Sequence, residues 1–280
     1  MTTTLRPTGP IQQGADGAKS RAYDVCDNGR PVGAVEIGTH PGFGASAGVL
    51  RSLSVDEPSR RRGRGTIAAL AAEEVLRGWG CSQVFLTAPA DNEGARRLAA
   101  ALGYTERSRN MLKDLARTVP AIPDGAIARG MSAEEFAQWQ RTSVDMYAQS
   151  WIDQGVPVEQ AMQKSRSDHA RNLPNGIDTA GMHFHVLVHE GAVVGHVWVS
   201  VREDSQGEMD GYVFDVEVSE EHRGRGYGRA LMRQAELIAL DAGAHRLGLH
   251  VFASNTPALR LYESLGYGAT QYNLAKMLTP

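Results

Sequence analysis

Runs of alternating polarity and runs with helical spacing divide the chain into short predicted strands and helices, most clearly in its second half. Alternation over four to eight residues is typical of half-buried strands, and apolar residues at three- and four-residue spacing are typical of amphipathic helices. In chain order, the pattern predicts a hairpin of Phe184–His189 and Val193–Val201, a strand Tyr212–Val218, a helix Gly226–Ala242, a strand Leu247–Phe252, a helix Pro257–Leu265 and a last strand near Tyr272–Leu278.

The pattern of the first half of the chain predicts the same order of strands and helices. Residues 5–20 are rich in Gly, Pro and Gln and are expected to be irregular, and 38–48 read as a Gly-rich connection. The predicted elements are a hairpin of Tyr23–Val25 and Val32–Ile37, a strand Val49–Val55, a helix Thr66–Arg77, a strand Val84–Thr87 and a helix Gly94–Leu102.

Two further helices are predicted only in the second half. Ser132 and Glu135 form a capping box that opens the first of them, and Val158–Asn172 forms the second. The first half has fewer than about 20 residues before its hairpin, which leaves no room for two helices. One face of the first helix is mostly aromatic and is expected to be core, with one edge available to line a pocket: Phe136, Trp139, Ser143, Met146, Tyr147 and Trp151.

The two halves are copies of one another. Val55–Gly65 lies 163 positions before Val218–Gly228, and from Val55 to Leu115 about 21 of about 61 positions are identical without a gap. A period this long indicates a duplicated domain. We therefore predict a domain at 1–118, a linker at 119–125 and a second domain at 126–280.

Composition limits the class of protein. The chain has 280 residues, 42% of them apolar, and a net charge of −3, which disfavours a general nucleic-acid binder. Two cysteines cannot build a disulfide framework, and neither a signal segment nor a membrane-spanning run is evident. These features predict a soluble, cytoplasmic protein with no nucleic-acid or membrane partner.

The duplicated turn Arg223-Gly-Arg-Gly-Tyr-Gly228 carries the chemistry. Glycines let the backbone close on an anion, and the first N–H groups of a helix have no intrahelical partner, so a pyrophosphate fits such a turn. Alone, it is equally compatible with an Arg/Gly-rich surface loop or a nucleic-acid-binding arm. The preceding strand, and a later helix that opens at Asn255 and ends in Leu-Gly-Tyr, favour the phosphate site.

Through Val216–Leu231 and Asn255–Tyr267 the chain resembles the GNAT superfamily of acetyl-CoA-dependent N-acetyltransferases, in a tandem arrangement. The resemblance implies an α/β (α+β) fold of two domains, each a mixed sheet flanked by helices and splayed between the strands ending at Val218 and Phe252, with the N-terminal copy lacking its front helices. It implies that backbone of Val216 to Val218 pairs with pantetheine and that Asn255 faces it. The CoA pyrophosphate is then held by the amides of Arg223, Gly224, Arg225, Gly226, Tyr227, Gly228 and Arg229.

Three residues are candidates for proton transfer. Periodicity alone places Tyr262 in the core, but the resemblance places it where the family often keeps an acid for the CoA thiolate. Strict alternation puts Glu217 and Asp215 on one strand face with Val213, where a carboxylate would take the proton of an acceptor ammonium. Glu217 is favoured because it is nearer the turn, although the pair could also be solvated edge carboxylates.

The first copy differs at these positions. It keeps Arg60, Gly63, Gly65 and Asn92, which resemble a second CoA site. Ala99 stands where the second copy has Tyr262, and Ser54 where it has Glu217. We expect this half to bind CoA without catalysis or to be purely structural.

The resulting hypothesis is an N-acetyltransferase in which a primary amine attacks acetyl-CoA directly in the second domain. The acceptor is a small molecule or a protein lysine, and the protein is a monomer or homodimer. The alternatives are a non-catalytic acyl-CoA-binding or sensing protein and an Arg-Gly nucleic-acid binder. His183, His185 and His189 have no Cys or carboxylate at metal-ligand spacing, so no metal is expected.

Overall fold

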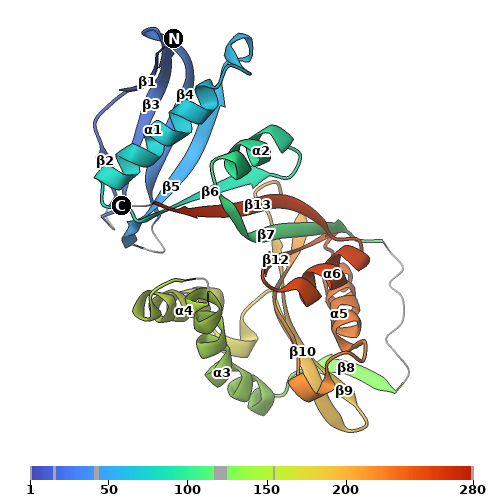
Figure 1. Cartoon of the computed structure of the whole chain (residues 1–280). Coiled ribbons are helices and arrows are strands. Elements are labelled where there is room, and N and C mark those ends of the chain that lie inside the picture. The colour runs from blue at the N-terminus through green and yellow to red at the C-terminus, as the bar shows by residue number, and fades with distance from the viewer. Residues whose placement is uncertain (1, 15–16, 41–43, 117–124, 154, 279–280) are drawn as a thin grey trace. The chain divides into compact units, whose positions relative to one another are not determined.

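The computed structural model describes residues 2–14, 17–40, 44–116, 125–153 and 155–278, and its chain divides into two compact units (Figure 1). Unit 1 contains residues 1–109 and 271–280, and unit 2 contains residues 110–270. The predicted linker 119–125 lies outside the described residues except for Gly125, so the predicted domain limits remain predictions. No helix in the described ranges is long and apolar enough to cross a membrane.

Unit 1 is a mixed sheet with α1 packed against β3, β4 and β5 (Figure 1). The strand order is β1, β3, β4, β5, β6 and then β13 from the end of the chain, with β2 beside β3. The elements are β1 Thr3–Pro7, β2 Gln12–Gln13, β3 Lys19–Asp27, β4 Arg30–His40, β5 Gly44–Val55, α1 Arg64–Gly78, β6 Gln83–Pro89, α2 Glu93–Ala101 and β13 Gly268–Met277.

Unit 2 is a mixed sheet with α3 and α4 on one face and α5 and α6 on the other (Figure 1). The elements are β7 Thr105–Asp114, whose second half belongs to this unit, β8 Ala126–Gly130, α3 Ala133–Ile152, α4 Val158–Asn172, β9 Met182–His189, β10 Ala192–Glu203, β11 Met209–Val218, α5 Tyr227–Asp241, β12 Arg246–Phe252 and α6 Thr256–Ser264.

Most predicted elements are confirmed, including the capping box of α3. The Ser132 hydroxyl accepts from the Glu135 amide at 3.2 Å, and the Glu135 carboxylate accepts from the Ser132 amide at 2.8 Å. The expectation that 5–20 is irregular was wrong for residues 5–7, which end β1, for β2, and for residues 19–20, which begin β3. Strand β7 was not predicted, because five charged residues among Thr105–Asp114 obscure its alternation.

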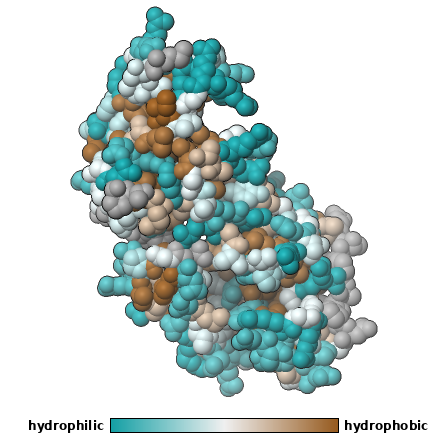
Figure 2. All heavy atoms as spheres, viewed as in Figure 1, coloured by the Kyte–Doolittle hydropathy of each residue, from teal (hydrophilic) through white to brown (hydrophobic). Residues whose placement is uncertain are grey.

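Apolar side chains are not confined to the interior. Figure 2 shows apolar residues gathered on the face of unit 1 that carries α1. On that helix Ile67 and Leu70 are 44% and 47% exposed, whereas Ala68, Ala69, Ala72 and Leu76 are buried. Small alanines on the inner face let the helix lie close to the sheet, and the larger aliphatic side chains face outward.

Strands β11 and β12 separate partway along their length. They pair in parallel only from Asp210 to Val213 on β11 and from Arg246 to Leu249 on β12. The same separation recurs in unit 1, where β5 pairs with β6 only from Ala47 to Leu50. Beyond Val213 the edge of β11 that faces β12 therefore carries backbone groups with no strand partner.

A β-bulge at Phe214 corrects one prediction. Trp198 pairs with Asp215 and Val199 with Val213, so Phe214 is an extra residue in β11. Asp215 and Glu217 therefore share a face, as predicted, but Val213 faces the opposite side, in the core cluster beneath α5. Strict alternation was wrong here because a bulge shifts the side-chain parity by one residue.

Each half of the sequence contributes a strand segment to the other unit. Lys113, from the end of the first copy, donates to the Glu236 carboxylate in unit 2 at 2.6 Å, and Tyr267 donates to the same carboxylate at 3.2 Å. Lys276, from the end of the second copy, donates to Glu73 in unit 1 at 2.6 Å. Both glutamate side chains are 4% exposed, so each depends on a lysine from the other copy.

We predict that Lys113→Met destabilises the protein strongly. The change leaves the Glu236 carboxylate buried without its cation, a loss of about 3–5 kcal/mol in the free energy of unfolding. Urea denaturation followed by circular dichroism measures it. Glu93→Gln, in an exposed pair with Arg97, is the control and should shift stability by no more than about 0.5 kcal/mol. Equal effects of the two changes would contradict the dependence on Lys113.

Candidate active site

The turn between β11 and α5 is shaped to receive an anion. After Val218 the chain makes a short 3-10 turn, Glu220–His222, and then passes through Gly224 at φ +78° and Gly226 at φ +86°. These left-handed conformations favour glycine. The Arg223 Nε donates to the Val218 carbonyl at 3.2 Å and braces the turn. The amino end of α5 thus faces outward with its dipole and its first N–H groups.

The side chains of the turn divide between core and solvent. Tyr227 is 6% exposed, and its hydroxyl lies 2.9 Å from His189 Nδ1, so only its backbone can serve an anion. The Arg229 guanidinium donates to the Ser264 hydroxyl at 2.7 Å. Arg223 and Arg225 are exposed. Any charge contribution to a bound phosphate therefore comes mainly from these two guanidinium groups.

The corresponding turn in unit 1 has the same backbone shape. Arg60 Nε donates to the Val55 carbonyl at 2.7 Å, and Gly63 caps α1 at φ +75°. Arg61 adopts φ +60° at the position that Gly224 occupies in unit 2. A non-glycine residue in the left-handed region costs about 1–2 kcal/mol, so the turn keeps its shape against a local preference.

Both asparagines predicted beside the cofactor cap their helices. The Asn255 side chain accepts from the Ala258 amide at 3.2 Å, and the Asn92 side chain accepts from the Ala95 amide at 3.0 Å. Capping uses only the side-chain oxygen, so the Asn255 amide nitrogen remains available as a donor.

Asp215 lies at the centre of a polar cluster beneath α3. Its Oδ2 accepts from the Trp139 indole at 3.1 Å and lies 2.9 Å from His196 Nε2. Burial alone would raise the pKa of Asp215, but the hydrogen bond and charge of His196, with the indole, hold it below its ordinary value. Burial likewise opposes the charged form of His196, yet Asp215 raises the pKa of that histidine above its ordinary value.

Glu217 lies directly across from His196 on the neighbouring strand. Burial raises the pKa of Glu217 above its ordinary value, and the charge of Asp215 adds to this effect, against His196 and Arg223. The two carboxylates that were predicted as a pair are therefore unlike. Asp215 is held ionised by two donors, and Glu217 is the more easily protonated.

A cavity of about 470 Å³ opens beside this cluster. Its wall is mostly apolar, with Trp139 and His196 forming the part that contacts Asp215. The remaining lining residues come from the start of α3 and from the β9–β10 hairpin: Met131, Glu134, Glu135, Gln138, Thr142, Val186 and Val193. The size and the apolar wall suit a small organic molecule.

Tyr262 on α6 is 7% exposed, and its ring lies 6.1 Å from that of Tyr267. Burial, and then the charge of Asp215, raise the pKa of Tyr262 to about 12. The phenol is therefore protonated at neutral pH and can act as a proton donor. In unit 1 the equivalent position is Ala99, which is 2% exposed and has no such group.

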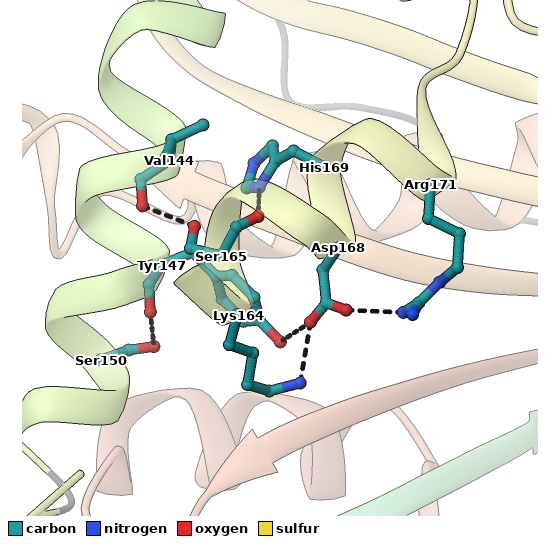
Figure 3. A network of polar contacts seen from close by, with 8 residues as sticks. All are labelled: Val144, Tyr147, Ser150, Lys164, Ser165, Asp168, His169 and Arg171. Atoms are coloured by element: carbon teal, nitrogen blue, oxygen red, sulfur yellow. Dashed lines mark hydrogen bonds and ion pairs between the residues drawn. The ribbon is translucent and has the colours of Figure 1, made fainter. Parts of the chain in front are cut away.

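Helices α3 and α4 are joined by the polar network of Figure 3. Asp168 accepts from Lys164 at 2.8 Å and from Tyr147 at 3.3 Å, and Ser165 donates to the Val144 carbonyl at 2.7 Å. These contacts fix α4 against α3, and α3 in turn places Trp139 over Asp215.

An aromatic group borders the separated strands. Trp151 contacts Phe252 edge-on at 5.3 Å, and Lys164 lies 5.2 Å from the Trp151 ring. Burial, and then the charge of Lys164, lower the pKa of His250 to about 4, so this histidine is neutral. The edge of α3 that was predicted to line a pocket thus lies beside the end of β12.

The three histidines considered for a metal site are not gathered into one. His185 Nδ1 lies 3.3 Å from the Gln234 amide, and His189 contacts Tyr227. Across the part of the chain that the structure describes, no group of three metal-ligating side chains is present.

His196 was missed in the sequence, and Trp139 was placed on a helix face expected to be core, with one edge available to line a pocket. A histidine within the apolar strand Val193–Val201 is a usable signal, because a polar group on a buried face needs a partner. The partner, Asp215, lies on a strand whose bulge the sequence did not disclose. Trp139 is indeed 6% exposed in the aromatic core, and it also donates to Asp215.

Comparison with known proteins agrees with this geometry. Residues 5–104 and 137–267 match the model of the acetyltransferase (GNAT) family. A mycothiol acetyltransferase of Thermomonospora curvata is 30% identical over 256 residues, which cover 89% of this chain and 79% of that protein.

Two solved structures share the fold. A GCN5-related N-acetyltransferase of Sphaerobacter thermophilus matches with a TM-score of 0.56 and 21% identity, covering 92% of this chain and 81% of the other. A tandem GNAT protein from the clavulanic acid biosynthesis pathway matches with a TM-score of 0.51 and 21% identity, covering 96% and 86%.

We predict that Arg61→Gly stabilises the protein. Glycine removes the left-handed cost at this position, partly offset by the greater freedom of the unfolded chain, for a net gain of about 1 kcal/mol. Chemical denaturation measures the change. Arg62→Gly is the matched control, because Arg62 is also exposed and has no positive φ, and it should bring no gain. A loss of stability in both variants would contradict the assignment of strain to Arg61.

Proposed function

The chain belongs to the acetyltransferase (GNAT) family, and from this premise we propose that it transfers the acetyl group of acetyl-CoA to a primary amine within unit 2. Because the chain belongs to this family it is an acyltransferase, and the alternative of a non-catalytic acyl-CoA sensor is no longer considered. The acceptor and the unit in which it reacts are the content of the proposal. A cavity of about 470 Å³ favours a small-molecule amine over a protein lysine.

One observation carries the assignment to unit 2. In that unit the anion-binding turn, the phenol of Tyr262 and the Asp215–Glu217 pair all belong to elements that border the separated strands β11 and β12. Unit 1 has a turn of the same shape but Ala99 and Ser54 in place of Tyr262 and Glu217, and its sequence has no counterpart of α3 and α4. Both turns therefore suit a phosphate, and unit 1 lacks, at the described positions 99 and 54, the phenol and the carboxylate that we assign to proton transfer in unit 2.

Acetyl-CoA fits the backbone of unit 2 in a defined direction. The pyrophosphate lies on the amides of the turn from Arg223 to Arg229, at the positive end of the α5 dipole. Val216 and Val218 pair with β10 on one side only, so their opposite edge is available to the pantetheine amides. Asn255 caps α6 with its side-chain oxygen, which leaves its amide nitrogen as a donor for the pantetheine.

The reaction then needs three proton transfers, because the acceptor ammonium loses two protons in turn and the leaving thiolate gains one. The acceptor ammonium loses a proton to the acidic cluster of β11, directly or through a neighbouring group, and the free amine attacks the thioester carbonyl. A strand amide between Val216 and Val218 stabilises the oxyanion. This intermediate then breaks its C–S bond, the nitrogen loses its second proton to solvent as the amide forms, and Tyr262 gives its proton to the leaving thiolate.

The turn of unit 1 is proposed as a second CoA-binding site without catalysis. Arg60, Gly63 and Gly65 reproduce the backbone of the active turn, and Asn92 reproduces the cap. Calorimetric titration distinguishes this from a purely structural turn, because it counts two CoA molecules per chain in the first case and one in the second.

Gly228→Val should weaken CoA binding tenfold or more, about 1.4 kcal/mol, and abolish turnover. An added Cβ already lies 3.2 Å from Leu261, and a valine would crowd the approach to the turn. Isothermal titration with CoA measures the affinity. Gly65→Val is the matched control, since its Cβ lies 3.5 Å from Leu98, and it should leave acetyl transfer largely intact. Transfer lost in a folded Gly65→Val protein but kept in Gly228→Val would reverse the assignment of roles.

Tyr262→Phe should lower kcat about 10²-fold and leave CoA affinity nearly unchanged. The ring packing survives, and only the proton donor is lost. Because burial raises the pKa of Tyr262 to about 12, the wild-type enzyme should keep this donor throughout the range of an ordinary pH profile. Release of free thiol from acetyl-CoA with a panel of amines measures kcat. A change within about twofold would mean that Tyr262 serves packing alone.

A further inference from the structure

We infer that His196, oriented by Asp215, is the group that accepts the proton of the acceptor ammonium, at the wall of the cavity beneath α3. The inference rests on the proposed function and makes it more specific. It assigns a base that lies on β10, outside the β11 residues considered so far. Asp215 then acts through His196 as a positioning residue.

The geometry fixes which ring nitrogen acts. His196 Nε2 lies 2.9 Å from the Asp215 carboxylate, so the neutral ring carries its hydrogen on Nε2 and donates it to Asp215. The lone pair of Nδ1 is then the basic site. His196 belongs to the cavity wall, and its side chain is 18% exposed, so a cavity-bound amine can contact the imidazole ring.

The carboxylate is itself held in place. Asp215 Oδ2 accepts from His196 and from the Trp139 indole, which approaches from α3. Two donors on one oxygen leave the carboxylate little freedom to rotate away. A carboxylate held against an imidazole selects the tautomer and stabilises the imidazolium once the ring has taken a proton.

The alternative base, Glu217, is less well suited. A carboxylate is ordinarily a weaker base than an imidazole, and proton removal is most efficient when the pKa of the base lies near the working pH. Glu217 faces His196 across the strands, so its charge instead adds to the field that favours the imidazolium.

The proton count is balanced. The ammonium gives one proton to His196 Nδ1, and the amine lone pair forms the N–C bond. After the C–S bond breaks, Tyr262 protonates the thiolate, and the tetrahedral nitrogen releases its second proton as the amide forms. Two protons have then left the nitrogen, one of them held by His196. One of the two passes to solvent and the other to the tyrosinate, which restores the resting enzyme.

Charges around the cavity favour a cationic acceptor. Glu135 is bound to Arg129 at 2.7 Å and to the Ser132 amide, so its charge is largely compensated. Glu134 also lines the cavity, and no contact to another described residue compensates its charge. The charged or titratable groups facing the pair are Asp215 and Glu217 of β11, Glu134 and Glu135 of α3, His169 of α4, and Arg223 of the turn.

These charges set the pH dependence. His196 must be neutral to act as a base, so kcat/KM rises with pH through its pKa, which lies above the ordinary value because of Asp215. In Asp215→Asn the opposing effect of burial remains, so this rise should move to lower pH while the maximal rate falls.

The test compares His196→Asn with the wild type in acetyl-CoA and a panel of primary alkyl- and arylalkylamines, with thiol release as the readout. Asparagine can still donate to Asp215 but is no base. The expected result is a kcat/KM about 100-fold lower at pH 7, with a deficit that narrows as the pH approaches the pKa of the free amine, and unchanged CoA affinity. Added imidazole should partly restore His196→Ala.

Two results would overturn the inference. Activity of His196→Asn within about twofold of wild type at pH 7 excludes a base at this position. A deficit that is equal at every pH and is not relieved by imidazole assigns His196 to structure alone. If the wild type itself releases no thiol with any amine, the proposed function fails. This outcome is distinguishable from the other two, because in both of those the wild type is active.

Discussion

The open edge of β11 is the constraint on which the site depends. A strand inside a sheet normally satisfies its backbone groups on both sides, yet β11 pairs with β12 only as far as Val213. Backbone groups beyond that point need water or a ligand. A substrate with its own amides, laid along this edge, completes the sheet as an added strand would. The roles proposed for the turn, Tyr262 and the β11 carboxylates all depend on this open edge.

The duplication shows which parts of the fold tolerate change. Both units keep the separated strands, the braced turn and the buried glutamate with its lysine. Unit 1 has lost the phenol, and a left-handed arginine stands in its turn. Groups that support the sheet are thus shared between the copies, and groups suited to proton transfer are found in one.

The sequence was sufficient for the repeated order of elements, because hydrophobic period and glycine turns are local signals. It was also sufficient for the α3 cap, where Ser132 and Glu135 act within one turn. It was insufficient for the Asp215–His196 contact, which depends on strand register and on the bulge at Phe214. The face predicted for Val213 was wrong for the same reason, since one extra residue in the strand inverts the alternation of side chains. The roles given to individual site residues are still predictions.

The exchange of terminal strand segments has a consequence for how such a protein can evolve. Residues 110–114 belong to unit 2, and residues 271–277 belong to unit 1. A recombination event that replaced the second half alone would place a new Glu236 environment beside the old Lys113. The same event would place a new Lys276 beside the old Glu73. We therefore expect the two halves to be inherited as a matched pair, because each half needs a strand segment from the other even where it has no Tyr262 or Glu217.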